Sequence, residues 1–346
     1  MVFKQLSIIG MVILTVVASC TQQQAASDHE KPQTIGQLNA ADERFHDLIP
    51  ENAAIEVLAE GFEWTEGPAW RMSENYVLFS DIPENTIHRW DRENGLSIYL
   101  RPAGYIWSDP VGREMGTNGL LFNENDELLA CDHGNRAVVK ISDQNYTKTI
   151  LAESYQGQRL NSPNDLVLHS NGDIYFTDPP YGLEGTDESP DKELDFNGVY
   201  RIDAQNGEVS LLHREMTRPN GIALSPDEQK LYVANSDPDN AFWMMFDLDT
   251  GGGIVTASTF FDATGWVKEG RRGLPDGMTV DAKGNIFATG PGGVLVFTPD
   301  GDHLGTIETG EATANCVFGG EDGSTLFITA DMYFCRIETN TKGLGL

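Results

Sequence analysis

Cysteine is scarce in this sequence of 346 residues, which contains four. Cys20 belongs to an N-terminal segment with its own pattern, and Cys131, Cys316 and Cys335 remain in the rest of the chain. Because three is an odd number, no disulfide framework is indicated, although a single Cys316–Cys335 pair stays open. None of the three has the close Cys or His neighbours that a zinc site needs. The sequence therefore predicts neither a disulfide scaffold nor a thiolate-bound zinc ion.

Positive charge is also in short supply. The chain has 23 Lys and Arg side chains against 53 Asp and Glu, which gives a formal net charge of −30. Such a surface repels a nucleic-acid duplex and an anionic lipid layer, so nucleic acid is excluded as a partner. The same acidity favours cations as ligands, although most of these carboxylates are expected on the solvated surface.

Long apolar runs are missing as well. The most apolar segment, Leu6–Val17, has 12 residues, whereas a transmembrane helix needs about 20. A lysine precedes this segment and two small residues follow it, a pattern typical of a secretory signal. Cys20 comes next, as in a bacterial lipobox, where the cysteine is acylated and becomes the first residue of the exported protein. Residues 1–19 are therefore predicted to be a lipoprotein signal peptide, with an ordinary cleaved signal as the alternative.

Residues 20–45 are rich in Gln, Ala and Asp and poor in large apolar side chains. Such a composition cannot bury enough surface to offset its ordering entropy, so it predicts a flexible tether that begins at lipidated Cys20. Because Thr21 rather than Asp follows Cys20, the resemblance to lipoproteins implies a cell-envelope protein anchored in the outer membrane by its lipid alone and facing the periplasm. No second change of composition marks a domain boundary, so residues 46–346 are predicted to form one domain.

Helical periodicity is absent over any stretch longer than about ten residues, and a different pattern recurs instead. A polar residue opens a short apolar strand, a turn of Asp, Asn and Gly follows, and a second strand is rich in β-branched and aromatic residues. The copies begin at Glu66, Asn118, Asn164, Asn220, Asp276 and Asn315, with steps of 52, 46, 56, 56 and 39 residues. Repeats of this length with several short strands are typical of propeller blades.

The six copies predict an all-β fold, a six-bladed β-propeller. A strand at Ile55–Leu58 precedes the first copy and has no copy of its own. We expect this N-terminal strand to pair with the last blade, because that pairing closes the ring and covers two sheet edges. A large β-sandwich is the alternative, but it does not account for innermost strands that each start with a polar residue.

The first residue of every copy is a carboxylate or a carboxamide. In a propeller the first strand of each blade lines the central channel, so these positions converge on one axis. Hard oxygen donors of this kind are the ligands that Ca²⁺ takes in proteins. Turn dipeptides explain any one position, and this explanation is preferred for Asn315, but they do not explain the same position filled in every copy. The ring therefore predicts a cation site on the axis.

Four motifs occur in order along the chain: Glu66-Gly67-Pro68-Ala69-Trp70, Ser162-Pro163-Asn164-Asp165, Arg218-Pro219-Asn220-Gly221 and Leu274-Pro275-Asp276-Gly277-Met278. They resemble the motifs of the senescence marker protein, gluconolactonase and luciferin-regenerating enzyme family, from about residue 54 to the C-terminus. The stretch Cys131–Arg136 is most similar to the gluconolactonase branch. The resemblance implies a six-bladed propeller with one divalent cation on its axis and the hydrolysis of sugar lactones.

Residue by residue, the resemblance implies that Glu66, Asn164, Asn220 and Asp276 are metal ligands. Ca²⁺ is the favoured cation, and Zn²⁺, Mg²⁺ and Mn²⁺ stay open because hard oxygen ligands accept several divalent ions. A bound cation polarises the lactone carbonyl, and a carboxylate at the same site takes a proton from the attacking water. Asp276 is the predicted catalytic base, with Asp165 as the second candidate.

Asn118, His133 and Asn164 are the predicted contacts to the lactone substrate, and for His133 a structural role between blades stays open. Further residues in long connections are candidates for the rim of the pocket or for plain solvated loops: Trp107, Arg113 and Arg272.

Two other functions fit the same residues. An organophosphate or phosphotriester hydrolase would use the same cation and the same oxygen ligands. A non-catalytic surface propeller that binds a partner would need the ring only to hold a structural cation. Lactone hydrolysis is preferred because the sequence offers both a set of ligands and a spare carboxylate.

Overall fold

The computed structural model describes residues 32–106 and 114–345. The predicted signal peptide, Cys20, Trp107 and Arg113 lie outside these ranges. Within the ranges, no helix has both the length and the apolar character that crossing a membrane requires. Residues from Gln33 onward belong to one compact unit.

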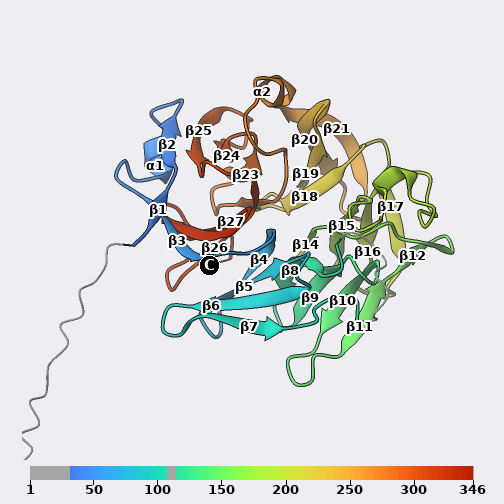
Figure 1. The fold of residues 1–346 in the computed structure, drawn as a ribbon. Coiled ribbons are helices and arrows are strands. Elements are labelled where there is room, and N and C mark those ends of the chain that lie inside the picture. The colour runs from blue at the N-terminus through green and yellow to red at the C-terminus, as the bar shows by residue number, and fades with distance from the viewer. Residues whose placement is uncertain (1–31, 107–113, 346) are drawn as a thin grey trace, which may run out of the picture. The chain divides into compact units, whose positions relative to one another are not determined.

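Six antiparallel sheets surround a common centre in this unit (Figure 1). Their innermost strands are β4 (Thr65–Arg71), β8 (Thr117–Phe122), β14 (Leu166–Leu168), β18 (Pro219–Leu224), β22 (Met278–Val280) and β26 (Thr313–Gly319). Each of these strands contacts the next, and β26 contacts β4, so the ring is closed. The predicted all-β, six-bladed propeller is confirmed.

Each blade continues outward from its innermost strand with successive antiparallel partners. The second strands are β5 (Tyr76–Asp81), β9 (Leu128–Asp132), β15 (Ile174–Asp178), β19 (Lys230–Asp237), β23 (Ile286–Gly290) and β27 (Thr325–Ala330). The third strands are β6 (Thr86–Asp91), β10 (Ala137–Ile141), β16 (Gly198–Ile202), β20 (Asn240–Leu248), β24 (Gly293–Phe297) and β28 (Tyr333–Glu338). The fourth strands are β7 (Gly95–Leu100), β11 (Lys148–Ala152), β17 (Val209–His213), β21 (Ile254–Asp262), β25 (His303–Glu308) and, in the last blade, β3 (Ile55–Glu60).

The remaining elements are short. They are the strands β1 (Thr34–Ile35) and β2 (Gln37–Ala40), the hairpin of β12 (Ser154–Tyr155) and β13 (Gln158–Arg159), and the helices α1 (Phe45–Leu48), η1 (Thr186–Glu188) and α2 (Thr264–Lys268).

The ring closes between the two ends of the unit, as predicted. Strand β3 pairs antiparallel with β28, with Glu60 opposite Tyr333 and Glu56 opposite Arg336. The Arg336 Nη2 atom lies 2.8 Å from Glu56 Oε2, which adds an ion pair to the backbone ladder. The first and last segments of the propeller therefore share one sheet, and neither leaves an open edge there.

The tether predicted for residues 20–45 is wrong over its described part. Strand β1 pairs with β3, and β2 pairs with β25, so each adds a fifth strand to a blade. Phe45 is fully buried. The composition was misleading because an edge strand gains backbone hydrogen bonds from the sheet and needs few large side chains. Only Ile35 and Leu38 of these two strands pack against the core.

The hydrophobic core lies between adjacent blades. Where the first blade meets the last, the rings of Phe79 and Phe334 stack with centroids 4.2 Å apart, and Phe327 stacks on Phe334. Aromatic stacking of this kind stabilises the face-to-face packing of neighbouring sheets.

No disulfide contributes to the part of the chain that the structure describes. Cys131, Cys316 and Cys335 are all buried as free thiols. The Cys316–Cys335 pair that the sequence left open does not form, and the expectation of a fold without a disulfide framework agrees with the structure.

Candidate functional site

Local backbone geometry aims the polar residues at the axis. The register between the first and second strands shifts at Glu66–Ala69, Thr117–Leu120, Pro219–Ile222 and Thr313–Asn315. Each shift lies at the start of an innermost strand. Bulges of this kind re-aim side chains and are frequent beside active sites.

Side chains of the second strands fix the backbone of the polar residues in the next blade. Ser80 Oγ donates to the carbonyl of Asn118 at 2.8 Å, and Thr177 Oγ1 donates to the carbonyl of Asn220 at 2.7 Å. The carboxylate of Asp178, at the end of β15, accepts the backbone N–H groups of Asn161 and Ser162, both at 2.8 Å. These hydrogen bonds hold the segments that carry the predicted ligands.

The structure brings the predicted ligands together. Glu66, Asn118, Asn164, Asn220 and Asp276 line one cavity of about 780 Å³. The first four are each at most 4 % exposed, whereas Asp276 is partly exposed. Five of the six positions predicted to converge on the axis therefore share a cavity.

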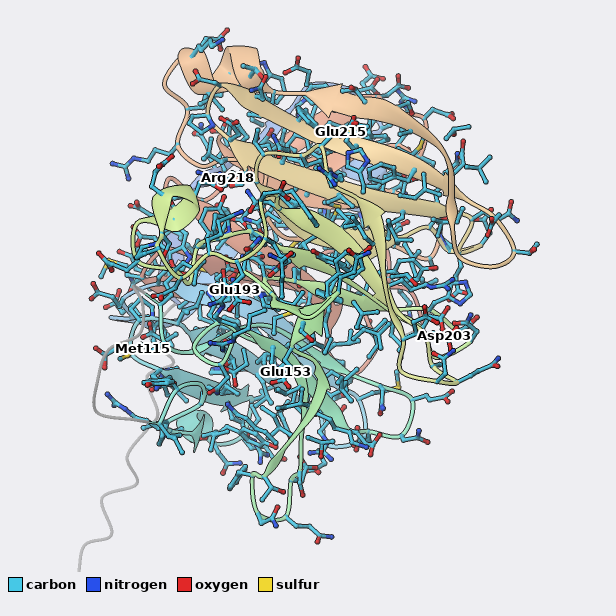
Figure 2. All side chains as sticks on the ribbon, turned by 90° about the vertical axis from the view of Figure 1, so that its right-hand side faces the viewer. Met115, Glu153, Glu193, Asp203, Glu215 and Arg218 are labelled. Carbon is cyan, nitrogen blue, oxygen red and sulfur yellow. The ribbon has the colours of Figure 1, made fainter. Side chains whose placement is uncertain are left out.

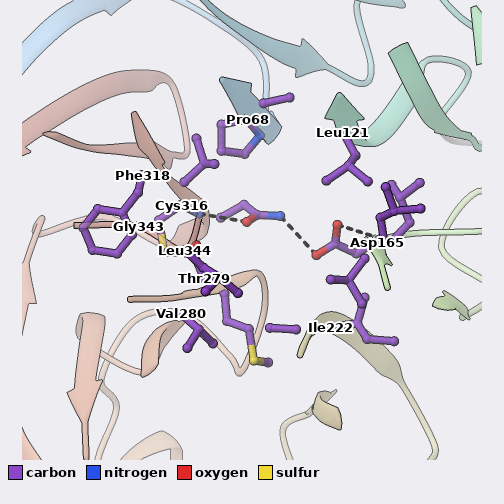
Figure 3. A pocket seen from close by; sticks show the side chains of 18 of the residues that line it. Pro68, Leu121, Asp165, Ile222, Thr279, Val280, Cys316, Phe318, Gly343 and Leu344 are labelled. Carbon is purple, nitrogen blue, oxygen red and sulfur yellow. Dashed lines mark hydrogen bonds between the residues drawn. The ribbon is translucent and has the colours of Figure 1, made fainter. Parts of the chain in front are cut away.

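The sixth position, Asn315, belongs to a second cavity, of about 270 Å³, as does Asp165 (Figure 3). Asn315 Nδ2 donates to Asp165 Oδ2 at 3.5 Å, and Asp165 Oδ1 accepts the N–H of Leu166 at 2.9 Å. Consecutive residues of an extended chain point to opposite sides, which explains why Asn164 and Asp165 line different cavities. This placement speaks against Asp165 as a catalytic base and against Asn315 as a member of the ligand ring.

The first cavity concentrates negative charge in a buried place. Burial raises the pKa of Glu66, and the carboxylates of Asp165 and Glu114 raise it further. Burial also raises the pKa of Asp276 well above its usual value, with Glu66, Asp165 and Glu114 adding to the effect. A positive charge placed between Glu66 and Asp276 would restore both ionised forms.

Two oxygen atoms of this cavity are orphaned. Asp276 Oδ1 and Asn118 Oδ1 are buried and have no hydrogen-bond partner. Buried oxygen atoms almost always find a partner in a folded protein. Asp276 Oδ1, the carboxylate of Glu66 and the carboxamides of Asn164 and Asn220 form a donor set that suits a hard divalent cation such as Ca²⁺, and Asn118 Oδ1 lines the same cavity as a further acceptor.

Cation sites rich in His, Cys, Asp or Glu are not seen: in residues 32–106 and 114–345, no group of three or more such side chains is placed to hold a metal ion. The candidate ligand set contains two carboxylates, and its remaining members are carboxamides.

His133 does not line this cavity, contrary to its prediction as a substrate contact. It is 1 % exposed and lines a separate pocket with Asn135 and Arg136. Its Nδ1 atom lies 3.0 Å from Glu114 Oε2, and its Nε2 atom lies 3.4 Å from Asn118 Nδ2. His133 therefore reaches the site through Asn118 and Glu114, which both line the cavity.

The rim differs from the prediction as well. Arg272 lies outside the set of cavity-lining residues and pairs with Glu311 at 2.5 Å. Arg218 lines the cavity instead and forms an ion pair with Asp187 of η1, beside which it lies in Figure 2.

Sequence reasoning missed Glu114, Tyr181 and Arg218, which all line the first cavity. Glu114 comes from the connection between the first two blades, and Tyr181 from the connection between β15 and β16 within the third blade, both outside the repeated pattern. Arg218 is the first residue of the motif Arg218-Pro219-Asn220-Gly221, and this position was the one available signal.

The fold and the cavity define a class: a six-bladed β-propeller with buried carboxylate and carboxamide oxygens gathered at one end of its axis. The chain belongs to the SMP-30/Gluconolactonase/LRE-like family, which matches residues 64–331. This membership confirms the resemblance that the four motifs indicated.

Individual proteins are similar over most of the chain. A gluconolactonase of Zymomonas mobilis is 40% identical over 337 residues, which cover 95% of this chain and 94% of that protein. The solved structure of a gluconolactonase from Xanthomonas campestris has a TM-score of 0.76 and 28% identity, and covers 89% of this chain and 96% of that one. A calcium-binding regucalcin from Agrobacterium tumefaciens has a TM-score of 0.65 at 21% identity, covering 83% of this chain and 94% of its own; it shares the fold.

Proposed function

We propose that the protein hydrolyses a sugar lactone of the gluconolactone type and that the reaction depends on one divalent cation. The observation that carries the proposal is the pair of orphaned buried oxygens, Asp276 Oδ1 and Asn118 Oδ1, in a cavity that also contains Glu66. The 40% identity to a gluconolactonase over nearly the whole chain supports the class of substrate.

Glu66, Asn164, Asn220 and Asp276 would hold the cation, since they line one cavity and offer only hard oxygen donors. Ca²⁺ fits this donor set best, with Zn²⁺, Mg²⁺ and Mn²⁺ as the alternatives to be tested. When bound, a divalent cation would polarise the lactone carbonyl and stabilise the negative charge that develops on its oxygen.

The chain's own residues supply the proton transfer. Asp276 accepts a proton from the water that attacks the lactone carbonyl, and the same proton then reaches the ring oxygen as the carbonyl–oxygen bond breaks. The product is an open hydroxy acid. Asp276 suits this role because its Oδ1 has no partner in the fold and it lines the cavity. Asn118 and Asn164 line the same cavity, which supports a role for both in contacting the hydroxyl groups of the sugar.

The proposal is tested with metal-stripped protein and a panel of sugar lactones, each divalent cation being restored in turn. Lactone hydrolysis that returns with Ca²⁺ is the expected result. A protein that hydrolyses lactones equally well in chelator refutes the cation dependence. Hydrolysis of a fluorophosphate without lactone hydrolysis would favour a phosphotriesterase, and cation binding without either activity would favour a binding propeller.

We further propose that the protein is exported and anchored to the outer membrane through acylated Cys20, facing the periplasm. The support is the apolar segment followed by small residues and Cys20. Mass spectrometry of the N-terminus of native protein is expected to find a lipid-modified Cys20, and a Cys20→Ser variant is expected to leave the membrane fraction. An intact Met1 or an unmodified N-terminus elsewhere contradicts the proposal.

A further inference from the structure

We propose that Glu114 and His133 form an orienting pair, which holds the carboxamide of Asn118 with its Oδ1 atom turned to the cavity that contains Glu66. The inference rests on the proposed lactone hydrolysis, because it gives Asn118 Oδ1 the task of accepting a hydrogen bond from a hydroxyl group of the lactone. His133 acts through Asn118 and is a positioning residue.

A buried chain of polar contacts carries the proposal. Glu114 Oε2 lies 3.0 Å from His133 Nδ1, and His133 Nε2 lies 3.4 Å from Asn118 Nδ2. His133 and Asn118 are 1 % and 2 % exposed. The imidazole ring is closely packed, since a Cβ atom added to Gly182 would lie 3.1 Å from His133 Cβ. The ring therefore has a fixed place behind Asn118.

Hydrogen-bonding capacity then sets the direction of each contact. Asn118 Nδ2, which can only donate, faces His133 Nε2, and Glu114 Oε2 faces Nδ1, so the contacts are all satisfied when the imidazole carries its proton on Nδ1. Nε2 is left as an acceptor, and the only donor on the Asn118 side chain is its NH₂ group. Asn118 must therefore turn Nδ2 to His133, which leaves Oδ1 for the cavity, in agreement with its lack of a partner in the fold.

The backbone of Asn118 is held independently of its side chain. Ser80 Oγ donates to the Asn118 carbonyl at 2.8 Å, and the N–H of Gly119 donates to the carbonyl of Asn164 at 2.9 Å. The Asn118 side chain can thus still exchange the places of Oδ1 and Nδ2 by a half-turn of its carboxamide. Without His133 the NH₂ group can face the cavity, where it cannot accept from a sugar hydroxyl.

A double-mutant cycle tests the coupling. The His133→Phe variant keeps the ring size and removes both nitrogens, and we expect it to raise KM for the lactone about tenfold, with kcat changed less than about threefold. In an Asn118→Ala background, the same His133→Phe change should raise KM no further, because no carboxamide is left to orient. His133→Gln should recover part of the loss, since its side-chain oxygen can accept from Asn118.

His88→Phe is the matched control. His88 stacks on Phe79 in the first blade, away from the cavity, and its replacement should leave KM unchanged. Calorimetric affinity for Ca²⁺ should be the same in wild type and His133→Phe, which separates orientation of the substrate contact from loss of the cation. Equal rises of KM in both backgrounds, or no rise in either, overturn the proposal.

A readout without activity keeps the inference separate from the proposed function. Nitrogen NMR of the imidazole reports which ring nitrogen of His133 carries the proton, and we expect Nδ1–H with an unprotonated Nε2. The side-chain NH₂ resonances of Asn118 should shift in His133→Phe. A wild type without lactonase activity would refute the proposed function alone, whereas an Nε2–H tautomer or an unshifted Asn118 amide would refute the orienting pair.

Discussion

Of the two cavities at the propeller axis, one is lined mainly by polar residues and the other mostly by apolar residues. In the cavity of about 780 Å³, Asp276 Oδ1 and Asn118 Oδ1 have no hydrogen-bond partner. In the cavity of about 270 Å³, Asp165 accepts from the Leu166 N–H and from Asn315 Nδ2, at 2.9 and 3.5 Å. Buried polar groups that serve only the fold almost always have hydrogen-bond partners within the protein. The smaller cavity also has one buried atom without a partner, Trp70 Nε1, but this is a donor, whereas the two unpaired oxygens of the larger cavity are suited to a cation or to a hydroxyl group.

Burial alone does not distinguish Asp165 in the smaller cavity from Asp276 in the larger one. It raises the pKa of Asp165 to about 6 and raises the pKa of Asp276 well above its usual value. The two carboxyl groups differ in their neighbours. Glu66 and Glu114 add negative charge around Asp276, whereas hydrogen-bond donors surround Asp165. A carboxyl group with a raised pKa indicates a functional site only when its oxygen atoms also lack hydrogen-bond partners.

The largest expected effect sets Asp276 against Asp165. At saturating cation, Asp276→Asn should lower kcat about 100-fold or more, because the carboxamide cannot take a proton from water. Asp165→Asn should cost far less, since Asp165 lines the other cavity. Steady-state kinetics at several cation concentrations measure both. An almost normal kcat in Asp276→Asn beside a dead Asp165→Asn would reverse the two assignments.

The second prediction concerns the cation. Glu66→Gln and Asn220→Ala should each weaken cation binding in calorimetry and lower Tm in Ca²⁺-containing buffer. The loss of stability should approach about 2.7 kcal/mol when the cation is present at 100 times the Kd of the wild type. The exposed Glu153→Gln is the charge-matched control and should change neither quantity. Wild-type affinity in both ligand variants would disprove the proposed ligand set.

The third prediction uses the raised pKa of Asp165. A folded-state pKa of about 6, above the ordinary aspartate value of 3.8, means that the folded protein holds this proton more tightly than the unfolded chain. Its contribution to stability is full below about pH 4 and is lost as the pH rises through 6. In cation-free protein Asp165→Asn should remove this loss, up to about 3 kcal/mol between pH 4 and 8. Chemical unfolding at several pH values measures it, and an unchanged pH dependence would contradict the assignment.

Much of this architecture was predictable because it repeats. The polar openers Glu66 to Asn315 recur at blade spacing, and the strand at Ile55–Leu58 had no copy, so its pairing with the last blade followed. The parts that were missed do not repeat. Strands β1 and β2 attach through backbone hydrogen bonds, which leave little trace in composition.

The site was predictable to the level of the ring and no further. Spacing places Asn164 and Asp165 beside the axis, but it does not say that strand alternation sends them to different cavities. Glu114 and Tyr181 come from unrepeated connections, where only the folded chain shows which side chains reach the cavity. His133 was predicted to contact the substrate or to hold neighbouring blades, whereas its contacts with Asn118 and Glu114 depend on distances that no motif contains.

The smallest expected effect concerns only the cavity of about 270 Å³, which Asp165 and Asn315 line. A Cβ atom on Gly277 would lie 1.9 Å from Asn315 Cγ, so Gly277→Ala must displace the side chain that contacts Asp165. Overpacking of this kind lowers the free energy of unfolding by about 1–3 kcal/mol. Gly265→Ala is the control, because Gly265 lies in α2 with nothing within 4 Å of its added Cβ, and alanine there should be neutral or stabilising.

The overlap between the Cβ atom of Gly277→Ala and the Asn315 side chain is tested by truncating Asn315. If Asn315 is what the new Cβ meets, then Asn315→Ala should cost less in the Gly277→Ala background than in wild type, because the truncation also relieves the overlap. Urea unfolding of the four proteins in the cycle, without cation, gives the coupling. Additive losses would show that Gly277 is constrained by something other than Asn315, and the contact between Asn315 and Asp165 would then not be what fixes glycine at this position.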